Sequence, residues 1–259
     1  MSFRLKLAQS SGALSGVDER LTWLETQLQT HAHDCDLMLL PEGFSCGFHI
    51  PDQIANVAEP MDGETAQKTA TLAQKHNTAI LYGYAERVDD TIYNSAQCID
   101  ARGNSIANHR KLMLPPGFEQ EHYTAGKTAT IFDFMGIKCG ILICYDIEFP
   151  ENTRHLADHG VQCVLAPTAL GIDWGVVSER TAPARAFENG IYMAYANSCG
   201  TENGATYFGG SCIVGPNGQD IARAVQEPVV LSATIDETTV TTAQTRLPYL
   251  TVRKTLPWM

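Results

Sequence analysis

Three side chains capable of chemistry follow directly after apolar runs, and the first is a cysteine. Cys144 ends the run Gly140-Ile141-Leu142-Ile143 and precedes Tyr145. A strand that enters a tight turn before a helix exposes the turn residue and its next backbone N–H, which is the layout of a nucleophile elbow. A nearby helix N-terminus would favour the thiolate. The alternative is an inert core cysteine, because free cysteines are usually buried.

Glu42 and Lys111 occupy similar places. Glu42 follows Leu37-Met38-Leu39-Leu40-Pro41, where a carboxylate is partly desolvated and suited to act as a general base. Lys111 precedes Leu112-Met113-Leu114, and Glu119 follows it eight residues later. Taken singly, these residues fit an exposed loop glutamate and a solvated basic cluster. The order Glu, Lys, Cys along one chain is more informative than any one of them.

The elements that must position these residues alternate between short apolar runs and segments of helical period. The helices expected are 18–32, 64–76, 151–159 and 176–189. The strands expected are 3–9, 36–40, 79–84, 93–100, 105–111, 137–144, 162–166, 192–197, 211–214 and 221–224. Strand, helix, strand and then paired strands occur in both halves, which predicts an α/β fold of two sheets covered by helices. We expect a single domain over 1–259, with 247–259 as a possible C-terminal arm.

Composition excludes several classes of partner. The net charge of -11 makes nucleic acid and anionic lipid unfavourable partners. No apolar run approaches the roughly 20 residues of a membrane helix, and the first residues lack the apolar core of a signal peptide. The eight cysteines show no CxxC pair, so we expect reduced thiols, no structural zinc and a cytoplasmic location.

The histidines offer one weak metal motif. His155 and His159 could share a helix face, but the glutamate of a zincin motif is missing, so we interpret them as surface residues. His31 and His33 are likewise expected to be solvated.

Seven short blocks appear in a fixed order along the chain. They are Leu40-Pro41-Glu42-Gly43-Phe44, His109-Arg110-Lys111-Leu112, Cys144-Tyr145-Asp146-Ile147-Glu148-Phe149-Pro150-Glu151, 164–169, 185–189, 195–197 and 209–211. Each block is weakly specific, but the ordered set resembles the nitrilase, or carbon–nitrogen hydrolase, superfamily over nearly the whole chain.

This resemblance implies a four-layer αββα sandwich that associates into a homodimer or a higher homo-oligomer. It also implies a cysteine-dependent amidase with Glu42 as base, Lys111 as cation and Cys144 as nucleophile. Glu119 resembles a second glutamate that holds the lysine and the substrate. Tyr145, Thr168 and Trp174 are expected to bind the substrate. No metal or organic cofactor is required.

The residues after the cysteine distinguish branches of this family. Nitrile-cleaving members favour Trp-Glu where this chain has Tyr145-Asp146, and carbamoyl-cleaving members favour Asn-Asp followed by Arg-Arg. The branch that acts on deaminated glutathione carries arginine where this chain has Glu148. The first two differences argue against nitrile and carbamoyl substrates, and the loss of the arginine argues against an anionic amide.

The nearest resemblance is to aliphatic amidases of the group that includes 5-aminopentanamidase, through 80–87, 92–95, 141–152 and 247–251. His109 and the loop 114–118 depart from that group. We expect short aliphatic primary amides as substrates, some with a distal amine that Glu121 or Asp173 could bind. A nitrilase or N-carbamoyl hydrolase with the same three residues, and a non-catalytic binding protein on this fold, remain alternatives.

Overall fold

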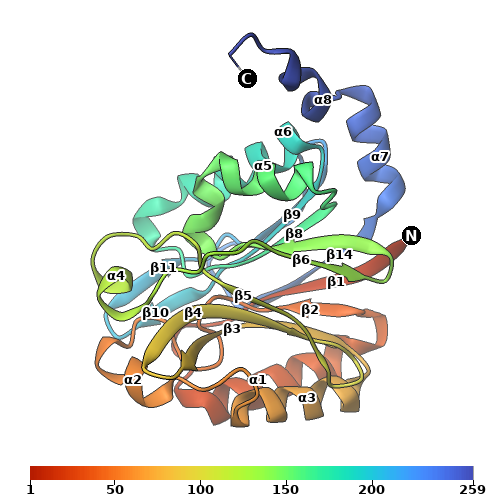
Figure 1. Cartoon of the computed structure of the whole chain (residues 1–259). Coiled ribbons are helices and arrows are strands. Elements are labelled where there is room, and N and C mark those ends of the chain that lie inside the picture. Colours follow the sequence, from red (N-terminus) through yellow and green to blue (C-terminus); the bar gives the residue numbers. More distant parts are fainter. Residues whose placement is uncertain (259) are drawn as a thin grey trace.

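Two six-stranded sheets face each other in the centre of the molecule (Figure 1). The computed structural model describes residues 1–258. The first sheet has the order β14 (Val229–Asp236), β1 (Ser2–Gln9), β2 (Leu37–Leu39), β3 (Ala79–Val88), β4 (Thr91–Ile99) and β5 (Ser105–Arg110). The second has the order β13 (Asp220–Arg223), β12 (Cys212–Val214), β9 (Tyr192–Ala196), β8 (Cys163–Pro167), β7 (Ile137–Ile141) and β6 (Thr130–Phe134). A small hairpin of β10 (Cys199–Glu202) and β11 (Ala205–Phe208) lies apart from both.

Helices cover the outer face of each sheet, which gives the four layers (Figure 1). α1 (Gly16–His31) and α3 (Glu64–His76) cover the first sheet, and α5 (Pro150–Asp158) and α6 (Ala182–Asn189) cover the second. The αββα fold class is therefore confirmed. No helix within residues 1–258 is both long and apolar enough to cross a membrane.

The main core lies between the sheets and explains why the strands read as continuous apolar runs. Leu37, Met38 and Leu39 of β2 are all fully buried, since one face meets the other sheet and the opposite face meets a helix. Beneath the first sheet, the helical spacing of Leu21, Leu24 and Leu28 in α1 buries all three. The central strands of each sheet, β1–β2–β3 and β7–β8–β9, run parallel. The loops that follow their carboxyl ends lie at the edge where the site described below is found.

Four strands and several short helices had no clear sequence pattern. The strands are β6, β10, β11 and β14, and the short helices are α2 (Ile54–Val57), α4 (Phe118–His122), α7 (Glu237–Arg246) and α8 (Tyr249–Val252). Only Val240 of α7 is buried, so this helix has no apolar stripe to reveal it.

The helix expected over 176–189 is present over that range, but its first half is not a regular α-helix. Residues Val177–Thr181 form a π-helical turn, and α6 follows with Pro183 in its first turn. Proline has no N–H for the regular i→i−4 bond, and the preceding turn widens accordingly.

The chain continues beyond β14 into α7 and α8, which rise along the side of the second sheet toward α5 and α6 (Figure 1). The rings of Phe187 and Tyr249 lie 5.6 Å apart, and Arg253 forms an ion pair with Asp158. The segment predicted as an arm thus contacts the helices of the second sheet. Met259, its last residue, lies outside the described residues.

Candidate active site

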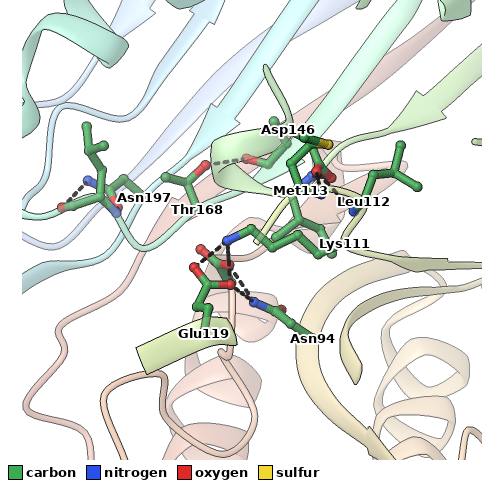
Figure 2. Close-up of polar contacts among 12 residues, drawn as sticks. Asn94, Lys111, Leu112, Met113, Glu119, Asp146, Thr168 and Asn197 are labelled. Atoms are coloured by element: carbon green, nitrogen blue, oxygen red, sulfur yellow. Dashed lines mark hydrogen bonds and ion pairs between the residues drawn. The ribbon is translucent and has the colours of Figure 1, made fainter. Parts of the chain in front are cut away.

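Lys111 stands at the centre of a buried charge cluster (Figure 2). Its Nζ donates to Glu42 Oε1 at 2.8 Å and to Glu119 Oε1 and Oε2 at 2.6 and 2.7 Å. Asn94 Nδ2 donates to both carboxylates, at 2.7 Å to Glu42 and 3.1 Å to Glu119. One ammonium therefore faces two carboxylates, and the Asn94 amide fixes their relative position.

The loop after β2 carries Glu42 and requires a close approach to β3. A side chain at Gly83 would meet Gly43 N at 2.4 Å and Glu42 Cα at 2.7 Å, so only glycine lets the two backbones approach this far. Gly43 itself has a φ of 60°. The Glu42 N–H donates to the Thr168 carbonyl at 3.3 Å, just beyond β8. The proposed base is thus tied to both sheets.

Cys144 lies at the first position of a tight 3₁₀ turn, Cys144–Glu148, that follows β7. Its φ of 45° lies in the left-handed region, which residues other than glycine rarely adopt. Backbone strain of this kind often occurs at functional turns. This is the strand-to-turn geometry of a nucleophile elbow.

Asp146 holds that turn against the segment after Lys111. Its Oδ1 accepts from the Leu112 and Met113 N–H groups at 3.0 and 2.8 Å, and its Oδ2 accepts from Ile143 N–H at 3.0 Å. Asp146 Oδ2 also lies 3.3 Å from His109 Nε2. The sequence neighbours of the lysine and the cysteine are thereby fixed together by one fully buried carboxylate.

Burial and charge set the protonation of this cluster. Burial disfavours the Lys111 ammonium, but the Glu42 and Glu119 carboxylates outweigh that effect and raise the pKa of Lys111. Burial, together with the charge of Glu42, raises the pKa of Glu119 to about 7 despite the attraction of Lys111. One ammonium thus serves two carboxylates, and Glu119 holds its proton more tightly than an exposed glutamate would.

The Cys144 thiol is not activated by its turn alone. Burial, and next the negative charge of Glu42, raise the pKa of Cys144 well above its ordinary value, while Lys111 acts in the opposite direction. Burial and the charge of Glu42 therefore outweigh the help that the helix N-terminus was expected to give the thiolate. The sulfur needs a base to remove its proton as it reacts.

A cavity of about 560 Å³ opens onto Cys144. Its wall is mostly aromatic, aliphatic and proline, with two carboxylates. The lining residues are Phe48, Pro115, Pro116, Phe118, Glu119, Cys144, Tyr145, Glu148, Ala169, Leu170, Gly171 and Trp174. Trp174 is 64% exposed, which places its ring where the cavity meets solvent.

Most of the site residues predicted from the sequence lie together in the structure, but Thr168 does not line the cavity. Glu42, Lys111 and Glu119 are in direct contact, while Cys144 shares the cavity wall with Glu119, Tyr145 and Trp174. Thr168 is not among the lining residues; it is fully buried, and its hydroxyl donates to the Ala166 carbonyl at 3.2 Å.

Neither Glu121 nor Asp173, the carboxylates suggested for an amine, lines the cavity, and both are exposed. Asn94, Asp146 and Glu148 have places in the site that sequence reasoning did not assign. Two signals were available: Asp146 directly follows Cys144-Tyr145, and Glu148 stands where a related branch carries arginine.

Another buried carboxylate, Glu202 on β10, holds the loop that follows Glu42. It accepts from Arg20 Nη2 at 2.7 Å, from the Phe48 and His49 N–H groups at 3.0 and 2.8 Å, and from the Tyr207 hydroxyl. Phe48 is part of the cavity wall, so this network fixes one side of the cavity. Within residues 1–258, no three His, Cys, Asp or Glu side chains are arranged to hold a metal ion.

Comparisons with known proteins give a consistent result. The family profile described as carbon-nitrogen hydrolase matches residues 14–244. The chain is 45% identical over 213 residues to "Hydrolase in pqqF 5'region" of Pseudomonas protegens, covering 81% of this chain and 75% of that protein. It is 31% identical over 227 residues to an (R)-stereoselective amidase of a Pseudomonas species, covering 87% and 82%. A solved amidase mutant from Nesterenkonia sp. AN1, in complex with butyramide, superimposes with a TM-score of 0.84 at 28% identity, covering 98% and 97%.

Proposed function

Because this chain belongs to the carbon–nitrogen hydrolase family and is an enzyme acting on amides, we propose that it hydrolyses primary amides of short aliphatic acids through a thioester on Cys144. The observation that carries this proposal is the contact of Lys111 with both Glu42 and Glu119 beside the cavity that exposes Cys144. These are the groups that amide cleavage by a thiol requires.

The proposed reaction begins with a proton transfer. Glu42 accepts the Cys144 proton as the sulfur attacks the amide carbonyl carbon, which fits a thiol whose pKa is raised by burial. One oxygen of Glu42, Oε2, is buried without a hydrogen-bond partner among the described residues, and so is available to take this proton.

The oxyanion formed by this attack needs donors already in place. We assign the Lys111 ammonium and the Tyr145 backbone N–H to it, and one such donor is typically worth roughly 3–4 kcal/mol in the transition state. Glu42 then gives the proton to the leaving nitrogen, the C–N bond breaks, and ammonia departs. The remaining thioester is hydrolysed when Glu42 removes a proton from water, and Cys144 regains its proton as the acid leaves.

The cavity supports a small, largely apolar acyl group. Phe48, Phe118 and Leu170 offer apolar contacts, and the volume of about 560 Å³ accommodates a short aliphatic chain. The related amidase from Nesterenkonia sp. AN1 has been crystallised with butyramide, which is an amide of this kind.

Ammonia release from a panel of substrates tests the proposal. We expect pentanamide to be cleaved with a kcat/KM at least tenfold above pentanenitrile and an N-carbamoyl amino acid, a difference of about 1.4 kcal/mol. Cys144→Ala should abolish turnover, and wild-type protein should gain one acyl mass on Cys144 with a slow amide. Cys199→Ala, a matched change at another buried thiol, should retain activity. A nitrile cleaved faster than the amide, or an acyl group on another cysteine, would contradict the proposal.

We further propose that the chain forms a single domain with 247–259 as an arm, and acts as a cytoplasmic homo-oligomer. All eight cysteines are free thiols, which fits a reducing compartment. Leu247, Tyr249 and Val252 near the chain end are exposed apolar residues, which fits contact with a second copy. Light scattering of the purified protein tests association, and a monomer at micromolar concentration would contradict it.

A further inference from the structure

Glu148 is a carboxylate in the cavity wall that has no partner of its own. It is half-buried at the end of the turn that begins with Cys144. Its backbone carbonyl accepts a hydrogen bond from Arg185 Nη2 at 2.9 Å. Among residues 1–258, no hydrogen bond or ion pair reaches the Glu148 side chain.

Among residues 1–258, every fully buried carboxylate has at least one cationic or N–H partner. Glu42 and Glu119 share Lys111, Glu202 pairs with Arg20, and Glu86 pairs with Arg110. Asp146 accepts three backbone N–H groups. Glu148 is half-buried in a mostly apolar wall, so it has lost part of its hydration without gaining a protein partner, and a cationic ligand in the cavity would supply the missing donors.

The nearest cations cannot fill this role. Lys111 and Arg185 both attract Glu148 electrostatically, but burial is the larger influence and the pKa of Glu148 is raised. Lys111 is held by two other carboxylates, and Arg185 Nη1 lies 3.1 Å from Glu188. Neither the Lys111 ammonium nor the Arg185 guanidinium is therefore free to neutralise Glu148.

The position of Glu148 relative to the nucleophile defines what would reach it. Cys144 and Glu148 are the two ends of one 3₁₀ turn, and both face the same cavity. At about 2 Å per residue, the turn separates their Cα atoms by roughly 8 Å. An acyl chain of four or five carbons, attached at Cys144, would extend past apolar rings toward a carboxylate.

We propose that Glu148 is the specificity-determining residue for amides whose acyl chain carries a protonated amine at its far end. This inference rests on the proposed amidase function and adds the substrate class. The ammonium would donate to the Glu148 carboxylate, while the amide carbonyl lies between Cys144 and Lys111. The same carboxylate would repel an acyl chain that ends in a carboxylate.

The experiment compares 5-aminopentanamide with pentanamide, two substrates of equal chain length that differ in one ammonium. For wild-type protein we expect kcat/KM to favour the amine by at least tenfold, mainly through KM. In Glu148→Gln this ratio should fall at least tenfold. The matched variant Glu151→Gln changes an exposed glutamate on the first turn of α5, and should keep the wild-type ratio.

A second measurement does not depend on a variant that folds. With wild-type protein and pentanamide as substrate, butylamine should inhibit competitively, and butanol should not at the same concentration. A wild-type ratio within twofold of unity, a ratio unchanged in Glu148→Gln, or equal inhibition by butylamine and butanol would overturn the role of Glu148. If pentanamide is cleaved well in these cases, the amidase proposal stands. Cleavage of neither amide would overturn both.

Discussion

Replacing Glu119 with glutamine should change the pH dependence of the enzyme in a specific way. Glu119 and Glu42 both accept hydrogen bonds from Lys111, and burial raises the pKa of Glu119 to about 7. Below that pH the cluster holds an extra proton. Above it the cluster carries one more negative charge, which makes Glu42 a stronger base toward the Cys144 thiol. We therefore expect wild-type kcat/KM to rise with an apparent pKa of about 7, a property of the whole cluster.

The size of the effect follows from the same value. A rise from the ordinary 4.5 to about 7 corresponds to roughly 3 kcal/mol, at about 1.4 kcal/mol for each pKa unit. In Glu119→Gln only the Glu42 carboxylate remains beside Lys111. The two carboxylates then no longer repel each other, so the cluster no longer takes up a proton near pH 7. The acid limb of kcat/KM should then disappear from the region of pH 7 or move at least one unit toward acid.

The free energy of unfolding should depend on pH in the opposite direction from kcat/KM, falling as the pH rises. A carboxyl group with a raised pKa binds its proton more tightly in the folded state, so its contribution to stability is complete below pH 4.5 and is lost as pH rises to about 7. Relative to Glu119→Gln, the free energy of unfolding of the wild type should therefore fall across this interval, by at most about 3 kcal/mol. Urea unfolding at pH 5, 6, 7 and 8 measures this difference.

The control for both assays is Glu121→Gln, an exposed glutamate on the same short helix. It should reproduce the wild-type pH profile of kcat/KM and of stability. Identical profiles for wild type and Glu119→Gln, or a wild-type acid limb near 4.5, would refute this account of the cluster.

Three further predictions concern the supports of the site. Lys111→Met should lower kcat by about 10²–10³-fold and raise KM by less, because the ammonium is needed where the oxyanion forms. A variant that raises KM and leaves kcat unchanged would contradict this. Gly83→Ala should reduce kcat more than tenfold, since its Cβ would lie 2.7 Å from Glu42 Cα and displace the base; full activity with an unshifted unfolding midpoint would contradict it. Glu202→Gln should raise KM more than it lowers kcat, because the Glu202 carboxylate accepts from the Phe48 N–H at 3.0 Å and so holds Phe48 in the cavity wall. A loss confined to kcat would count against that role.

The sequence predicted the fold layers and suggested the candidate reactive side chains, but not the residues that hold those side chains in place. Strands buried on both faces, such as β2 and β8, appear as continuous apolar runs, and α1 shows its stripe of leucines. Short strands such as β10 and β11 are defined by each other, so no local pattern announces them. The helix α7 buries only Val240 and therefore has no periodicity to detect.

Roles that depend on a partner from elsewhere in the chain were invisible for the same reason. Asn94 acquires its role because two carboxylates from other elements meet at its amide. Glu148 could be read as the loss of an arginine, but the absence of a partner for its carboxylate appears only in three dimensions. Glu121 and Asp173 were suggested without knowledge of how their segments fold; they lie on two short helical turns, and neither lines the cavity.

The position of β1 between β2 and β14 has a consequence for synthesis of the protein. Ser2–Gln9 are synthesised before every other strand of this sheet, yet every residue of β1 pairs with β14, the last of its strands along the chain. At ~5–20 residues per second, the roughly 220 residues that separate the two strands take on the order of 10–40 s to translate. During that interval one edge of β1 has no native neighbour, and an open apolar edge invites pairing with other chains. Fragments that end before Val229 should therefore aggregate as nascent or truncated products rather than accumulate as weakly active monomers.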